Sequence, residues 1–84
     1  MTETIAGFLR DATSALGEAG IQSPEIDAEL LIGHVLGRSR GEVQARSITG
    51  ATLTDELVER LGKMVERRAA REPLQHITGN KPVR

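Results

Sequence analysis

The side chains that could carry out chemistry are few in this chain, and their spacing does not assemble an active site. The two histidines, His34 and His76, lie far apart, and neither belongs to the i, i+4 histidine pair typical of a zinc-binding helix. The sequence has no cysteine, which removes thiolate metal ligands and cysteine nucleophiles. We therefore expect no catalytic, cofactor-binding or metal-binding residue within these 84 residues.

Three carboxylates lie close together in the sequence, at Glu25, Asp27 and Glu29. On a helix, positions 25 and 29 share one face and position 27 lies on another, so the three groups do not converge on one bond. We interpret Asp27 as a buried or half-buried residue paired with an arginine of another helix. His34 is interpreted as a partly buried histidine that is hydrogen-bonded to a neighbour.

Five basic residues recur between positions 60 and 71: Arg60, Lys63, Arg67, Arg68 and Arg71. As a structural feature they are a solvated helix face near the negative end of the helix dipole. As a functional feature they would dock an acidic protein surface or RNA phosphates, in a way that salt weakens. Both interpretations stay open, and the candidate partner-binding residues are Arg60, Lys63, Arg67, Arg71, Gln75 and His76.

The charge balance argues against a nucleic-acid partner. The net charge is −1, although residues 1–35 hold six acids and one base while residues 36–84 hold six acids and ten bases. A nucleic-acid-binding domain is expected to be basic overall and, for single strands, to offer aromatic side chains for stacking. Phe8 is the only aromatic residue.

No segment resembles a targeting or membrane-spanning sequence. Residues 1–10 contain Glu3 and lack the basic start of a secretory signal, and the longest apolar-rich stretch, residues 28–36, is too short to cross a bilayer. We expect a cytoplasmic, monomeric protein with no membrane partner.

The elements that position these residues are predicted to be helices. Apolar residues recur at helical spacing, with start and stop signals that predict helices over residues 5–19, 24–36, 40–45, 55–70 and 74–77. Residues 47–52 are predicted to be a loop. Short connections between four or five helices predict an all-α fold, a small irregular bundle.

Capping residues support these helix bounds. Ser23, Ser39 and Thr54 are expected to accept backbone hydrogen bonds at helix starts, with prolines 24 and 73 in first turns. Glycines 20, 37 and 79 are expected to end helices. The apolar residues of 24–36 cover more than one face, which predicts a central helix largely surrounded by the others. Glu56 and Glu59 are spaced to pair with bases one turn later.

Two segments together resemble a known family. Residues 23–37 read SPEIDAELLIGHVLG, and residues 67–79 read RRAAREPLQHITG. The first resembles the pattern S-P-x-x-D-A-E-x-L-L followed by a helix-closing glycine, and the second resembles R-R-x-x-x-E-P-x-x-[YH]-[IL]-T-G. Both patterns, in this order, are typical of the HemK/PrmC family of protein-glutamine methyltransferases.

The resemblance implies that residues 1–79 are a helical N-terminal, substrate-recognition domain. Residues 80–84 would begin the linker to a methyltransferase domain that lies outside this chain. In the family that domain binds S-adenosylmethionine and methylates a glutamine, in class I peptide chain release factors the glutamine of Gly-Gly-Gln. The Asn-Pro-Pro-Tyr motif and the glycine-rich cofactor loop of that domain are missing here. We therefore expect that this fragment neither catalyses methyl transfer nor binds the cofactor.

The implied role is to help bind and position the protein substrate with contacts far from the reacting amide. The implied partners are a class I release factor and the catalytic domain in cis, and a ribosomal protein is an equal substrate candidate. The segment 74–79 would contact either partner. Residues 82–84 depart from the aromatic residue usual in the family after the Thr-Gly turn. The alternative function is a free-standing helical module that binds protein or nucleic acid.

Overall fold

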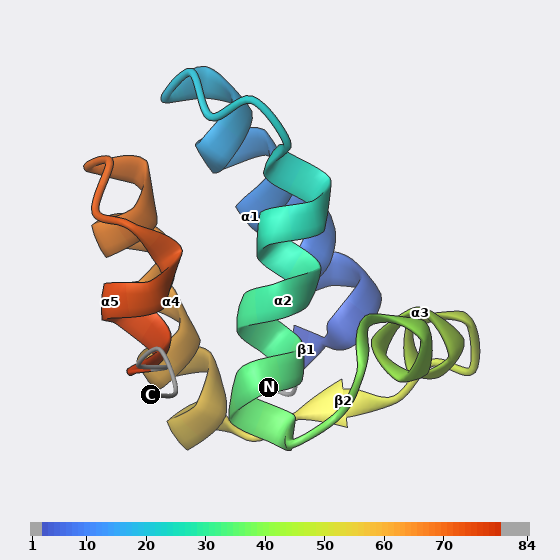
Figure 1. The fold of residues 1–84 in the computed structure, drawn as a ribbon. Coiled ribbons are helices and arrows are strands. Elements are labelled where there is room, and N and C mark those ends of the chain that lie inside the picture. The colour runs from blue at the N-terminus through green and yellow to red at the C-terminus, as the bar shows by residue number, and fades with distance from the viewer. Residues whose placement is uncertain (1–2, 80–84) are drawn as a thin grey trace.

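Five helices and two short strands make up residues 3–79, the part of the chain that the computed structural model describes. In chain order they are β1 (Glu3–Thr4), α1 (Ile5–Glu18), α2 (Pro24–Leu36), α3 (Arg40–Ile48), β2 (Thr52–Leu53), α4 (Asp55–Ala69) and α5 (Leu74–Thr78) (Figure 1). The predicted small helical bundle is confirmed, with a two-stranded sheet added to it. All helices except α3 match their predicted bounds to within one residue.

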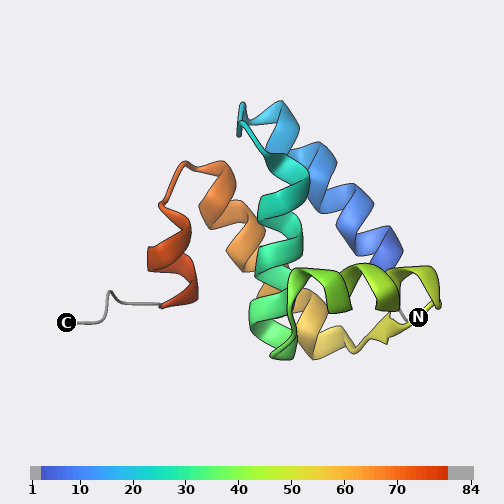
Figure 2. The same ribbon diagram turned by 45° about the vertical axis from the view of Figure 1, so that its right-hand side comes forward.

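Helix α2 lies in the middle of the bundle and contacts α1, α3, α4 and α5. Figure 2 shows α3 lying across the lower part of α2, close to the start of α1. Ala28, Leu31 and Ile32 of α2 are at most 1% exposed, which confirms the central position. The helix is not enclosed on all sides, however, because Ile26 and Leu30 are 41% and 39% exposed. The short α5 covers only part of that face.

The core takes aliphatic side chains from every helix and from β2. Its fully buried members include Ile5, Leu16, Leu31, Ile32, Val43, Leu53 and Leu61. Burying a side chain of this size stabilises the fold by about 1.5–3 kcal/mol relative to leaving it in water. Among the described residues, every buried side-chain nitrogen and oxygen has a hydrogen-bond partner. The chain therefore has a core of its own.

The two strands pair antiparallel, with Glu3 opposite Leu53 and Thr4 opposite Thr52. The prediction of a loop over residues 47–52 is therefore wrong at both ends, because α3 continues to Ile48 and β2 begins at Thr52. A capping box starts α3: the Ser39 hydroxyl accepts the Glu42 N–H, and the Glu42 carboxylate accepts the Ser39 N–H. Two satisfied donors favour a longer helix than propensity predicts.

The other helix ends follow the predicted signals, with two exceptions at helix starts. The Thr54 hydroxyl accepts a backbone N–H at the start of α4, as predicted. At the start of α1 the Thr4 hydroxyl does the same, although no cap was predicted there. Ser23 makes no such bond, so its predicted capping role is wrong, and α2 begins with Pro24, which has no N–H to satisfy. Pro73 precedes α5 as its cap residue instead of lying in the first turn.

Helix α5 ends at Thr78, and Gly79 follows it with a φ of 74°. The domain boundary at residue 79 stays a prediction. The predicted linker at residues 80–84, including the departure at residues 82–84, lies outside the described residues, so it stays a prediction. Within residues 3–79, no helix has the length and apolarity needed to span a membrane.

Candidate partner-binding surface

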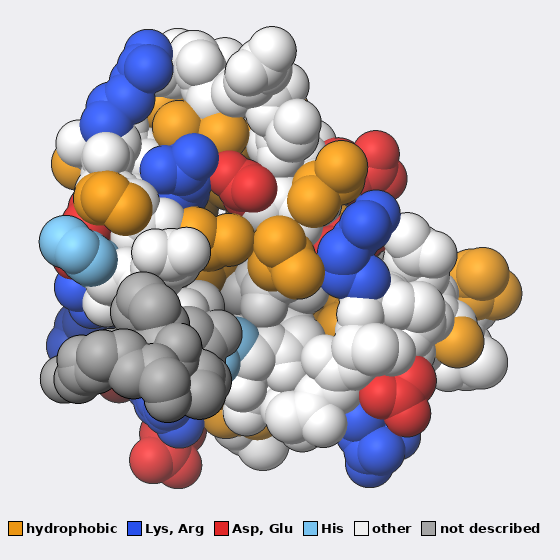
Figure 3. Space-filling view, viewed as in Figure 1, with side chains coloured by type: hydrophobic (Ala, Val, Ile, Leu, Met, Phe, Trp, Pro, Cys, Tyr) orange, Lys and Arg blue, Asp and Glu red, His pale blue; other side chains and the backbone are white. Residues whose placement is uncertain are grey.

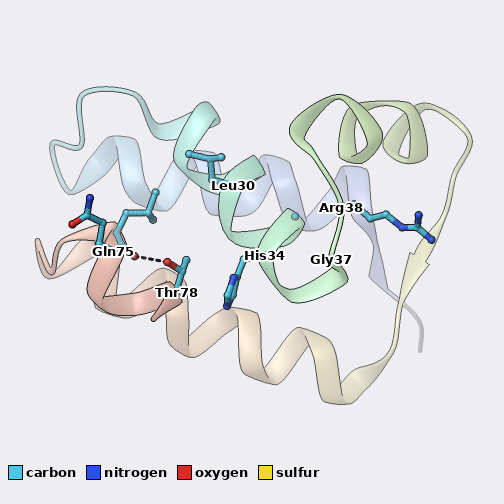
Figure 4. A pocket seen from close by; sticks show the side chains of 8 residues that line it. Leu30, His34, Gly37, Arg38, Gln75 and Thr78 are labelled. Atoms are coloured by element: carbon cyan, nitrogen blue, oxygen red, sulfur yellow. Dashed lines mark hydrogen bonds between the residues drawn. The ribbon is translucent and has the colours of Figure 1, made fainter. Parts of the chain in front are cut away.

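A groove of about 520 Å³ runs between α2 and α5. Its lining residues are Leu30, Gly33, His34, Gly37 and Arg38 from α2 and the residues that follow it, and Leu74, Gln75 and Thr78 from α5. Figure 4 shows Leu30 and His34 on one side of the groove, with Gln75 and Thr78 on the other. We call this feature the α2–α5 groove. It has an apolar wall and no acidic lining residue.

His34 lines this groove as an exposed residue. The interpretation of His34 as a partly buried, hydrogen-bonded histidine is therefore wrong, since no hydrogen bond of its side chain is present among residues 3–79. On α2, His34 continues the exposed stripe formed by Ile26 and Leu30, each one helical turn before the next. Within the same residues no cluster of histidine and carboxylate side chains could hold a metal ion.

The position of α5 is fixed by a polar network at the end of α4. The Arg68 guanidinium donates to the Asp27 carboxylate of α2 at 2.9 Å, which confirms the predicted pairing of Asp27 with an arginine of another helix. Arg68 also donates to the carbonyl oxygen of Glu72, just before α5. Ile77 of α5 is 7% exposed and completes the core. Arg68 thus joins α2, α4 and the turn before α5.

Two candidate residues in the basic run are engaged within the molecule. Arg67 binds the Glu72 carboxylate, with 2.9 Å between Arg67 Nε and Glu72 Oε1. The hydrogen bond from Arg67 holds the pKa of Glu72 below its usual value. Arg71 donates to the carbonyl oxygen of Ala19 at 3.2 Å. Both guanidinium groups therefore stabilise the turn that follows α4, while remaining exposed at the surface.

Arg60 and Lys63 differ from these two, because both are exposed and neither forms an ion pair within residues 3–79. The predicted ion pairs of Glu56 with Arg60 and of Glu59 with Lys63 are absent from the described residues. The six candidate residues therefore lie in different parts of the surface. Arg60, Lys63 and Arg67 lie on α4, and Arg71 lies in the turn that follows it. Gln75 lines the α2–α5 groove, and His76 is exposed on α5.

Comparison with known proteins gives this surface a context. The sequence profile of the PrmC N-terminal domain family matches residues 8–79. The chain belongs to the PrmC N-terminal domain family. This finding confirms the resemblance drawn from the two sequence patterns.

Curated relatives of this PrmC N-terminal domain are named release factor glutamine methyltransferase. They include proteins of Corynebacterium glutamicum, 42% identical over 80 residues, Deinococcus radiodurans, 46% over 72 residues, and Escherichia coli, 42% over 72 residues. These alignments cover 95%, 86% and 86% of this chain. The chain spans only about a quarter of each relative, 26%, 25% and 24% of their lengths. No solved structure matches it.

Sequence reasoning missed two features of this PrmC N-terminal domain. The first is the apolar wall of the α2–α5 groove, formed by Leu30 and Leu74; the i, i+4 spacing of Ile26 and Leu30 is the signal that could have indicated it. Figure 3 shows hydrophobic side chains gathered over α2 and toward α5. The second is Glu29, which is 2% exposed and accepts hydrogen bonds from side chains of α3.

Proposed function

We propose that this chain is the substrate-binding domain of a release factor glutamine methyltransferase. In this proposal it binds a class I release factor at a distance from the Gly-Gly-Gln glutamine. The methyl transfer from S-adenosylmethionine takes place in the part of the enzyme outside this chain. The observation that carries the proposal is the family match over residues 8–79, together with relatives that are named for this activity.

The surface we assign to the release factor is the outer side of α4. Arg60 and Lys63 are exposed there and form no ion pair within residues 3–79, so both charges are available to a partner's carboxylates. Exposed charges of this kind steer association and fix orientation more than they add affinity. The same side of α4 carries Glu56, which interrupts the positive charge. An irregular mixture of charges fits a protein surface better than a regular phosphate backbone.

The test is an NMR titration of the isotope-labelled 84-residue chain with a purified class I release factor. We expect backbone shifts concentrated on α4 around Arg60 and Lys63, which weaken as salt is raised. A double charge reversal, Arg60→Glu with Lys63→Glu, should weaken binding roughly 2- to 30-fold, because each exposed pair contributes about 0.2–1 kcal/mol.

The control is Arg10→Glu, which reverses another exposed charge, on α1, where the Arg10 guanidinium lies 3.9 Å from the Asp11 carboxylate. This variant should bind the release factor as the parent chain does. A random DNA duplex is the second control, since shifts with the duplex instead of the release factor would favour the nucleic-acid alternative. The absence of any shift with the release factor at high concentration would contradict the proposal.

A further inference from the structure

The α2–α5 groove is an apolar surface that the described part of the chain leaves open. Leu30 is 39% exposed, and its neighbour one turn earlier, Ile26, is 41% exposed, although both belong to the central helix of the bundle. At Gly37 no atom lies within 4 Å of the position that a side chain would occupy. The part of the groove lined by Gly37 is therefore open to close approach by another backbone.

The last described residues of the chain lie beside this groove. Helix α5 forms one wall, and Thr78, the last residue of α5, is itself a lining residue. Gly79 then ends the helix at the edge of the groove, with its N–H bonded to the carbonyl oxygen of Gln75. In the relatives, about three quarters of the protein lies outside the part that this chain matches.

We propose that the α2–α5 groove is the docking site, in cis, for the catalytic part of the methyltransferase. The inference rests on the proposed function, because it assumes that this domain belongs to such an enzyme. A segment tethered by a short linker has an effective concentration in the millimolar range, far above that of a separate protein in solution. In this proposal, a tethered segment therefore occupies the apolar groove in preference to a separate protein.

The chemistry of the groove defines the segment that fits it. Leu30 and Leu74 offer apolar contacts, while His34 and Gln75 offer hydrogen-bonding groups at the borders of the groove. Figure 4 shows His34 and Gln75 apart, on different helices. Arg38 also lines the groove, and its guanidinium lies 3.7 Å from the Glu42 carboxylate of α3. Docking here leaves Arg60 and Lys63 on α4 for the release factor, so each partner has its own surface.

The experiment joins this chain, through residue 84, to the remaining part of the Corynebacterium glutamicum relative. Leucine and isoleucine methyl groups are labelled in this chain alone, and their NMR shifts are compared with those of the separate 84-residue chain. We expect the methyl signals of Leu30 and Leu74 to shift in the joined protein. Those of Ile48, which is 85% exposed on α3, should stay unchanged.

A pair of variants separates docking from general disturbance. Leu30→Asp places a charge in the groove, and Ile48→Asp places the same charge on α3; both positions are exposed enough for the isolated chain to fold. In the joined protein, Leu30→Asp should return the Leu74 methyl signal to its position in the isolated chain. Ile48→Asp should leave that signal where docking puts it. Unshifted groove methyl groups, or equal effects of the two variants, would overturn the inference.

Adding the release factor distinguishes this inference from the proposed function. If the groove methyl groups of the isolated chain respond to the release factor and do not respond to joining, the groove is a substrate site, and cis docking is overturned while the proposed function stands. If joining shifts them and the release factor affects no residue of either protein, cis docking stands and the proposed function fails.

Discussion

Arg71 adopts a backbone conformation that side chains other than glycine rarely take. Its φ is 74°, and no other non-glycine residue among 3–79 has a positive φ. The guanidinium reaches back to the Ala19 carbonyl at the end of α1, beside Gly20. A side chain at Gly20 would meet Arg71 Nη2 at 2.7 Å, and Gly20 itself has a φ of 85°. The two residues together fix how the ends of α1 and α4 meet.

This geometry predicts opposite effects of glycine at two neighbouring arginines. Arg71→Gly should be more stable than Arg71→Ala by about 1 kcal/mol, because only glycine adopts a left-handed conformation without steric cost. Arg67→Gly should be less stable than Arg67→Ala by about 0.5–1 kcal/mol, because Arg67 lies within α4. Chemical denaturation of the four variants measures both differences. Equal signs at the two positions would contradict the conformation of Arg71.

Two glutamates make the stability of the fold depend on pH. The backbone N–H of Ser39 lowers the pKa of Glu42, and the hydrogen bond from Arg67 lowers the pKa of Glu72. A carboxyl with a lowered folded-state pKa contributes stability above its ordinary pKa, here 4.5, and loses it as the pH falls through the folded-state value.

We therefore expect the melting temperature to fall as the pH is lowered from 6 to 3, by less in Glu42→Gln and Glu72→Gln than in the parent chain. Glu59→Gln is the control, because the structure gives Glu59 no ion pair within residues 3–79. If the Glu42 and Glu72 variants lost as much stability in acid as the parent does, these two carboxylates would not be the groups responsible.

The sequence predicted that Asp27 would pair with an arginine, but not which one. Arg60, Arg67, Arg68 and Arg71 are all spaced within one run. Arg68 is the arginine that reaches Asp27 where α4 packs against α2, and that packing involves side chains from several helices at once. Local spacing therefore identifies the need for a partner, while the identity of the partner is a property of the assembled fold.

At the scale of elements, the caps explain most of the agreement between sequence and structure. The hydroxyls of Ser39 and Thr54, both predicted as caps, each satisfy one N–H that the first helical turn leaves unpaired. These signals are local, so they are visible in the sequence. The pairing of β1 with β2 joins residues that are far apart in the chain. Each strand is only two residues long, which is too short for a periodic sequence pattern to predict it.

The caps also yield a test with an internal control. Ser39→Ala and Thr54→Ala should each lower the free energy of unfolding by about 0.5–2 kcal/mol, since each removes an oxygen that accepts a backbone N–H. Ser23→Ala should cost much less, because the Ser23 side chain makes no cap hydrogen bond. Urea denaturation of the three variants measures the ranking. A Ser23 variant as unstable as the Ser39 variant would contradict it.

At the scale of the whole molecule, the described residues present two surfaces of different character. The outer side of α4 carries exposed charges, and the α2–α5 groove is apolar. The charges could be predicted from sequence because they belong to one helix. The groove could not, because it exists where two helices far apart in sequence meet and the short α5 stops covering α2.

The proposed roles of these surfaces predict a particular kinetic signature. In the joined protein, Arg60→Glu with Lys63→Glu should raise KM for the release factor roughly 2- to 30-fold and leave kcat within about twofold. The reason is that contacts remote from the reacting amide bind the ground state and the transition state alike. Steady-state methyl transfer measures both constants, with Arg10→Glu as the control. A fall in kcat at unchanged KM would place these residues nearer the chemistry.

The pairing of β1 with β2 has a consequence for the order of events during protein synthesis. Glu3 and Thr4 are polymerised about fifty residues before their partners Leu53 and Thr52. At a translation rate of roughly 5–20 residues per second, the second strand is synthesised about 3–10 s after the first. Helix α1 can form early, but its final position depends on a strand translated later. The domain therefore completes its fold only after most of it has been translated.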